Sequence, residues 1–259
     1  MNTKSLSPMV LLAALALGGH AATAQAQTAP VVVELFTSQG CGACPAADAV
    51  LKEAAEASPA EGVQVIPLAW HVDYWNELGW KDPFSSTGAT QHQRDYVERF
   101  KSGDRYTPQM VVDGRSEFVG RSKERLDEAL RGAARHPKAS VELSVAKAEG
   151  APGMIVSVKA TNVPPPAAER DAVQVVAYIT EDNLTTIVSA GENAGQTLEN
   201  SAVVREVVQL GAVTPGREFN VTTTIPLKPG WNPGELNVVV VLQVRISRTI
   251  TGAATQPAP

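Results

Sequence analysis

Residues 31–45 read VVVELFTSQGCGACP, and this stretch decides the fold. It opens with a run of β-branched and apolar residues, which is typical of a buried strand. Pro45 suits the first turn of a helix, and residues 46–57 are rich in Ala and Glu, so we expect a helix there. Cys41 is therefore predicted at a strand-to-helix turn, exposed to solvent, and Cys44 one turn inside the helix, shielded.

Cys41 and Cys44 are the only cysteines in the chain. A helix N-terminus favours a thiolate, the attacking species in disulfide exchange. As a structural staple, a loop of about four residues would contribute only about 2 kcal/mol in the loop-entropy model. A zinc site would need a second ligand pair, and His71, His92 and His136 show no paired ligand spacing. The sequence predicts a redox-active pair and no metal or cofactor.

Residues 1–26 are predicted to be a secretory signal peptide. Lys4 precedes an apolar run over residues 9–17, and Ala24-Gln25-Ala26 fits a cleavage site before Gln27. The run is shorter than the roughly 20 residues of a membrane-spanning helix, and no other segment approaches that length. We expect a soluble periplasmic or secreted protein in a compartment where disulfides persist. The net charge of −5 gives no basic surface for nucleic acid.

The segments that follow suggest a mixed α/β region and then an all-β region. Residues 63–72 form a second strand-type run, which would lie parallel to the first across the intervening helix. Residues 87–101 are predicted to be a helix, residues 109–119 a hairpin, and another helix starts after Ser122. Beyond residue 137 we expect short strands at residues 140–147, 154–160, 173–181, 184–188, 203–210, 219–225 and 236–246.

The predicted order β-α-β-α-β-β-α, with Thr107-Pro108 opening the third strand, resembles the thioredoxin fold over about residues 30–136. A second resemblance is carried by residues 34–41, 70–75, 78–84, 106–109 and 191–195. Through these segments the mature chain as a whole resembles the exported bacterial DUF1223 proteins, a family of unknown function.

The expected fold class is an α/β thioredoxin-like N-terminal domain over residues 27–137, followed by an all-β sandwich-like domain over residues 138–251. Residues 252–259 are predicted to be a disordered tail. The thioredoxin resemblance also implies a cis peptide between Thr107 and Pro108, facing Cys41. Such a bond would leave the Thr107 backbone free to pair with an extended substrate.

Glu34, His71 and Asp73 are candidate supporting residues. Thioredoxin's buried carboxylate falls at the offset held here by Leu35, and Glu34 lies one residue earlier, on the other face of the strand. Glu34 would therefore take the place of that proton acceptor only if the loop before Cys41 is one residue longer than in thioredoxin. His71 and Asp73 share a face at the strand end, where they would stabilise a thiolate and shuttle protons or belong to a network that fixes the loop.

Residues 191–198 are too polar and Gly-rich for a strand. We expect this loop, through Glu192 and Asn193, to fold over the edge that bears Cys41, His71 and Pro108 and to shape a substrate cleft. The alternative is a surface turn remote from the cysteines.

Two classes of function follow from the sequence. One is a thiol-disulfide oxidoreductase acting on protein or peptide thiols and disulfides, with an unknown redox partner. The other is a non-catalytic binding module, either a Cu(I)-binding protein or a scaffold with an inert disulfide. The Gly-Ala dipeptide between the cysteines supplies no His to stabilise a thiolate, so a strongly oxidising protein is not expected.

Overall fold

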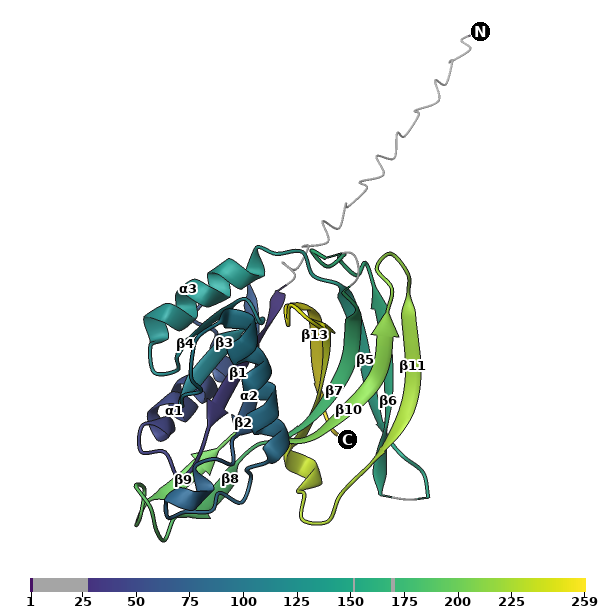
Figure 1. Cartoon of the computed structure of the whole chain (residues 1–259). Coiled ribbons are helices and arrows are strands. Elements are labelled where there is room, and N and C mark those ends of the chain that lie inside the picture. Colours follow the sequence, from purple (N-terminus) through teal and green to yellow (C-terminus); the bar gives the residue numbers. More distant parts are fainter. Residues whose placement is uncertain (2–27, 151, 169–170) are drawn as a thin grey trace.

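The computed structural model describes residues 1, 28–150, 152–168 and 171–259. The predicted signal peptide lies outside this part of the chain, apart from Met1. An eight-stranded mixed sheet runs through the molecule in the order β13-β12-β7-β10-β2-β1-β3-β4 (Figure 1). A three-stranded sheet, β11-β6-β5, packs against one part of it, and the short hairpin β8-β9 stands apart.

The first half contains the predicted β-α-β-α-β-β-α order. Its elements are β1 (Ala29–Thr37), α1 (Cys44–Glu56), β2 (Val63–His71), the 3-10 turn η1 (Asn76–Leu78), α2 (Thr87–Phe100), β3 (Gln109–Val112), β4 (Ser116–Val119) and α3 (Lys123–Ala134). As predicted, β1 and β2 are parallel, and Thr37 lies opposite His71 at their carboxyl ends. Strand β3 pairs antiparallel with β1 and forms a hairpin with β4.

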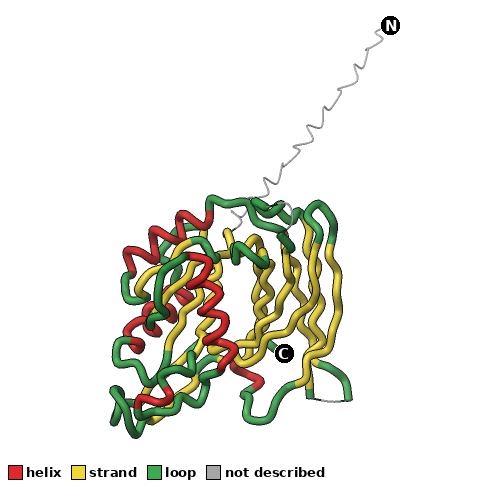
Figure 2. The backbone as a smooth tube through the Cα atoms, in the orientation of Figure 1, coloured by secondary structure: helices red, strands yellow, loops and turns green. Residues whose placement is uncertain are grey.

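The second half is built almost entirely of strands (Figure 2). They are β5 (Ser140–Lys147), β6 (Gly153–Thr161), β7 (Val173–Glu181), β8 (Leu184–Ile187), β9 (Thr197–Asn200), β10 (Val203–Val213), β11 (Phe219–Pro226), β12 (Leu236–Val244) and β13 (Ile250–Pro257), with the 3-10 turn η2 (Pro233–Glu235) before β12. The seven strand-type runs predicted from the sequence are all present.

The predicted fold class, a thioredoxin-like α/β domain followed by a separate β sandwich, is wrong. Strand β10 lies parallel to β2, with Val203 opposite Ala69, and the Ala69 N–H donates to the Ala202 carbonyl (2.8 Å). Strands β7, β12 and β13 continue the same sheet beyond β10. The physical reason is that β2 has a second edge whose backbone groups need partners, and the second half supplies them.

The prediction of a disordered tail over residues 252–259 is also wrong. Strand β13 pairs antiparallel with β12 along nearly its whole length, and the Ala139 N–H donates to the Thr251 carbonyl (2.7 Å). The small residues there allow close packing, because a Cβ atom on Gly252 would lie 2.9 Å from the Cβ of Ala139. A segment that looks like low-complexity tail in the sequence is therefore a strand with little room beside it.

Alternation along β1 divides the core between the two faces of the sheet. Val31, Val33 and Leu35 pack with α1 and α3, whereas Val32 and Phe36 pack on the α2 side. The α2-side cluster continues into Tyr178 of β7 and into β12 and β13, so it spans both halves. A third cluster fills the space between β7, β12 and the three-stranded sheet.

Candidate functional site

The Cys41–Cys44 disulfide lies at the junction of β1 and α1, with the two Cα atoms 5.4 Å apart. Cys44 is the first residue of α1, and its N–H donates to the Cys41 carbonyl (3.1 Å). Cys41 is 1% exposed and Cys44 0% exposed. The expectation that Cys41 faces solvent is therefore wrong for the oxidised protein.

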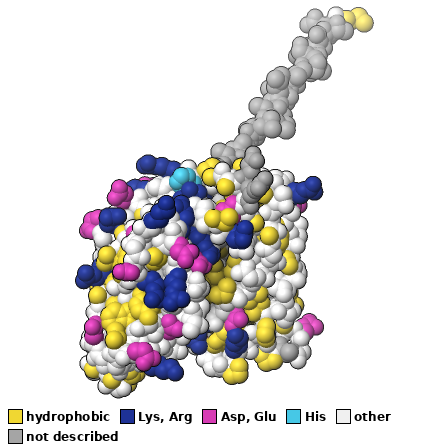
Figure 3. Space-filling view, viewed as in Figure 1, with side chains coloured by type: hydrophobic (Ala, Val, Ile, Leu, Met, Phe, Trp, Pro, Cys, Tyr) yellow, Lys and Arg dark blue, Asp and Glu magenta, His cyan; other side chains and the backbone are white. Residues whose placement is uncertain are grey.

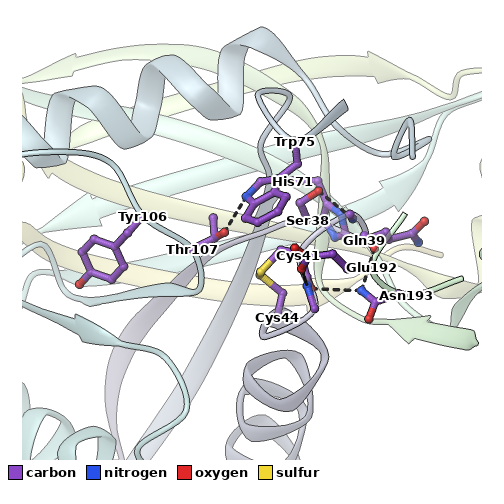
Figure 4. Close-up of a disulfide and its surroundings, with 12 residues drawn as sticks. Ser38, Gln39, Cys41, Cys44, His71, Trp75, Tyr106, Thr107, Glu192 and Asn193 are labelled. Carbon is purple, nitrogen blue, oxygen red and sulfur yellow. Dashed lines mark hydrogen bonds between the residues drawn. A yellow bond between two sulfur atoms is a disulfide. The ribbon is translucent and has the colours of Figure 1, made fainter. Parts of the chain in front are cut away.

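The backbone of the cysteine turn is covered by the loop between β8 and β9, which carries Glu192 and Asn193 (Figure 4). The Asn193 side-chain amide donates to the carbonyls of Gln39 (2.9 Å) and Cys41 (3.1 Å). The Glu192 carboxylate accepts from the Gly42 N–H (2.7 Å). The loop thus lies over the cysteine turn, where the sequence analysis expected it, and is not a surface turn remote from the cysteines.

Gln39, which the sequence analysis did not single out, joins the cysteine turn to the β8-β9 hairpin. Its side-chain amide donates to Thr186 Oγ1 (3.0 Å) and Asn200 Oδ1 (2.8 Å), and its Oε1 accepts from Trp80 Nε1 (3.2 Å). Its buried amide group is therefore fully hydrogen-bonded, which fixes the residues before Cys41.

His71 forms a buried ion pair with Asp82 beneath the cysteine turn. His71 Nδ1 lies 2.7 Å from Asp82 Oδ2, and both side chains are fully buried. Burial alone would lower the pKa of His71, but the charge of Asp82 and the hydrogen bond to it raise that pKa. The same Asp82 oxygen accepts from the Gln39 N–H (2.8 Å). His71 therefore belongs to a network that fixes the loop, one of its two proposed interpretations.

Asp73 points elsewhere. Its carboxylate accepts a hydrogen bond from the Thr90 hydroxyl (2.5 Å), and its N–H donates back to the same hydroxyl (3.1 Å). Thr90 belongs to α2, so these contacts hold the chain after β2 against that helix.

Asp48 is a site residue that the sequence analysis missed. It lies on α1 four positions after Cys44, the spacing that brings two side chains to one helix face. Burial raises the pKa of Asp48 to about 6, although the charge of His71 and the Thr37 hydroxyl oppose the rise. A carboxyl with this pKa exchanges protons near neutral pH. The spacing from Cys44 was the signal that could have found it.

The Thr107–Pro108 peptide is cis, as the thioredoxin resemblance implied. The Thr107 hydroxyl accepts from Trp75 Nε1 (2.8 Å). Trp75 in turn lies against the cysteine turn, because a Cβ atom on Gly40 would lie 3.3 Å from the Trp75 Cβ. Figure 4 shows Thr107 on the side of the disulfide opposite Asn193.

Glu34 lies on the α2 face of the sheet, away from α1. This buried carboxylate accepts from Trp70 Nε1 (3.1 Å) and the Tyr96 hydroxyl, and it pairs with His92 Nε2 (2.6 Å). A cavity of about 480 Å³ opens beside this cluster, between α2 and strands β7 and β10. On the same face of the molecule, Figure 3 shows hydrophobic surface beside basic side chains. The structure therefore does not bring Glu34 together with the cysteines.

Within the described residues, no cluster of three or more His, Cys, Asp or Glu side chains could hold a metal ion. None of the helices in that part of the chain is long and apolar enough to cross a membrane.

The fold and site define a mainly β protein, built on a mixed eight-stranded sheet, whose single cysteine pair forms a disulfide at a strand-to-helix junction under a loop from the other half. The chain belongs to the DUF1223 family, described as a protein family of unknown function, whose model matches residues 32–243.

Solved structures that are similar to this chain include the following two. One is the X-ray crystal structure of a protein from Agrobacterium tumefaciens, with 28% identity and a TM-score of 0.66 over 88% of this chain and 94% of that one. The other is HBP35 of Porphyromonas gingivalis, with 17% identity and a TM-score of 0.66 over 89% of this chain and 76% of that one. The second likeness concerns the fold alone. Among curated proteins, none matches this chain.

Proposed function

We propose that this protein is an exported thiol-disulfide oxidoreductase that acts through Cys41 and Cys44. The observation that carries the proposal is that the cysteine turn is already fixed without a covalent bond. Asp82 holds the Gln39 N–H, and Asn193 holds the carbonyls of Gln39 and Cys41. A loop of about four residues adds only about 2 kcal/mol through chain entropy, so a disulfide here contributes little as a staple.

In the oxidised protein, a substrate thiolate attacks the sulfur of Cys41. The Cys41–Cys44 bond breaks, a mixed disulfide forms with the substrate, and the electron pair leaves on the sulfur of Cys44. A second substrate thiolate then attacks the substrate sulfur and releases Cys41. The substrate leaves with a new disulfide, and the protein has gained two electrons and two protons. The reverse sequence reduces a substrate disulfide.

Asp48 is the group we assign to the proton of Cys44. Its position one turn further along α1 and its pKa of about 6 suit a carboxyl that gives a proton to the leaving sulfur and takes it back in the reverse direction. His71 and Asp82 support Asp48 and the turn without contacting substrate.

The substrates we propose are thiols and disulfides of exported proteins or peptides. Residues 1–26 would direct the chain to the periplasm or the medium, where such disulfides persist.

The reduction potential tests this proposal. The pair is equilibrated with glutathione or dithiothreitol buffers, and the reduced fraction is measured by mass after alkylation of the unfolded protein. A working pair should have a potential between about −270 and −120 mV, whereas a structural bridge lies below about −300 mV. As a second measurement, Cys44→Ser should hold partners as mixed disulfides through Cys41, and Cys41→Ser should hold none. A potential below the working range together with no trapped partner would contradict the proposal.

A further inference from the structure

We infer that Glu192 tunes the Cys41–Cys44 pair toward the disulfide, by holding a negative charge at the start of α1 where a Cys41 thiolate would otherwise be stabilised. The inference deepens the proposed function, because it concerns the potential at which the pair would exchange electrons. The effect of Glu192 on the reduction of the cysteine pair can be measured even if the proposed function is wrong.

The contact is made inside the cysteine motif itself. Glu192 Oε2 accepts from the N–H of Gly42, the residue bonded to Cys41, at 2.7 Å. A Cβ atom on residue 42 would lie 2.8 Å from the same oxygen, which is too close for real atoms. A glycine between the cysteines is therefore what admits the carboxylate. Gly42 in the first half of the chain and Glu192 in the second half therefore fit each other: the residue without a side chain leaves room for the carboxylate.

The first turn of α1 brings no acidic side chain of its own to this N–H. The helix has no acidic side chain in its first turn, and its N-cap residue, Ala43, makes no side-chain hydrogen bond. An uncapped helix N-terminus carries a partial positive charge and free N–H groups, which favour a thiolate on the preceding cysteine. Here the Glu192 carboxylate accepts a hydrogen bond from one backbone N–H group of this turn, and it places its own negative charge there.

The charge acts on the reduced state and not on the disulfide. When two glutathione thiols reduce the pair, the Cys41–Cys44 bond breaks and oxidised glutathione forms, so two electrons pass to the cysteines. One proton goes to Cys44, and the second is released to solvent wherever Cys41 is a thiolate. A Cys41 thiolate would then lie next to a residue hydrogen-bonded to a carboxylate, and like charges at such range repel. The neutral disulfide feels no such repulsion. Glu192 therefore makes the pair harder to reduce.

The charge must be separated from the hydrogen bond, because Glu192 also helps to hold its loop in place. Glu192→Gln does this, since the amide oxygen still accepts from the Gly42 N–H while the charge is gone. Gly42→Ala works from the other side, because the added methyl group displaces the carboxylate without altering it. Glu142→Gln, on the exposed face of β5, removes one negative charge far from the cysteines and is the matched control.

The experiment compares the equilibrium constants of these variants with glutathione at about pH 9, where a cysteine of ordinary pKa is mostly a thiolate and feels the charge. For like charges roughly 6 Å apart and partly screened by water, we expect Glu192→Gln to favour reduction by about 3- to 10-fold. Gly42→Ala should shift the constant the same way, and the double variant should add little to either single change. Glu142→Gln should leave the constant unchanged.

Salt supplies a readout that a purely structural role would not move. At about 1 M salt, where the Debye length is about 3 Å, the difference between the wild type and Glu192→Gln should shrink. No shift in Glu192→Gln, or an equal shift in Glu142→Gln, would overturn the inference. A shift in Glu192→Gln, together with a wild-type potential below the working range and no partner trapped by Cys44→Ser, would instead count against the proposed function and leave this inference standing.

Discussion

Replacing Asn193 by Ala should open the cover over the disulfide. The Asn193 side chain is 2% exposed and is the group that ties the β8-β9 loop to the carbonyls of Gln39 and Cys41. Each hydrogen bond contributes about 0.5–1.5 kcal/mol net, so losing both should favour the open loop by about 2 kcal/mol. That free energy corresponds to about a 30-fold larger open fraction.

The assay is the alkylation of Cys41 by iodoacetamide in a Cys44→Ser background, where Cys41 is the only thiol. If the loop opens and closes faster than the reagent reacts, the rate follows the open fraction. The Asn193→Ala protein should therefore react about 30-fold faster than its parent, because access limits the reaction. Asn220→Ala is the matched control, since Asn220 is exposed on β11, a strand of the three-stranded sheet. Equal rates in the Asn193→Ala protein and its parent would refute the cover.

Three further outcomes are expected. Asp48→Asn should slow disulfide exchange and, because the folded pKa of about 6 lies above the unfolded value of 3.8, stabilise the fold above about pH 6 by about 1–3 kcal/mol. That gain should vanish as the pH falls through about 4, where the carboxyl is protonated in both states, and urea unfolding at both pH values measures it. Asp82→Asn should leave His71 without its buried partner and lower the free energy of urea unfolding by about 3–5 kcal/mol; a loss under about 1 kcal/mol would show that the pair is not needed. Gly114→Ala should lower the melting temperature by several degrees, because the residue has a φ of 62° and its Cβ would lie 1.9 Å from the Arg248 carbonyl oxygen; an unchanged melting temperature would contradict this close approach.

The local elements were predicted well because each one depends on the types of residues that are neighbours in the sequence. The strand at residues 31–36 and the helix after Cys44 follow from residue types, and the parallel pairing of β1 with β2 follows from the helix between them. The register then places His71 opposite Thr37, at the edge where the cysteines lie.

The pairing of β10 with β2 could not be predicted in the same way. Every strand edge carries the same backbone N–H and C=O groups, whatever its side chains. The residue pattern of one strand therefore does not show which distant strand pairs with it. The same limit explains the error over Cys41, whose cover is provided by a loop about 150 residues later in the chain. The resemblance to the DUF1223 proteins included that loop. Its segments 34–41 and 78–84 also contain Gln39 and Asp82, but nothing in the sequence singled out these two residues as part of the site.

The sheet that joins the two halves also bears on how the protein comes apart. Strand β10 completes β2, and the α2-side core takes residues from both halves, including Phe36 and Tyr178. Neither half can lose its structure without stripping partners from the other, so calorimetry should record one cooperative heat-absorption peak. For the same reason, a fragment ending near residue 137 should not refold by itself. The disulfide motif and the all-β half are therefore expected to fold and unfold as one unit.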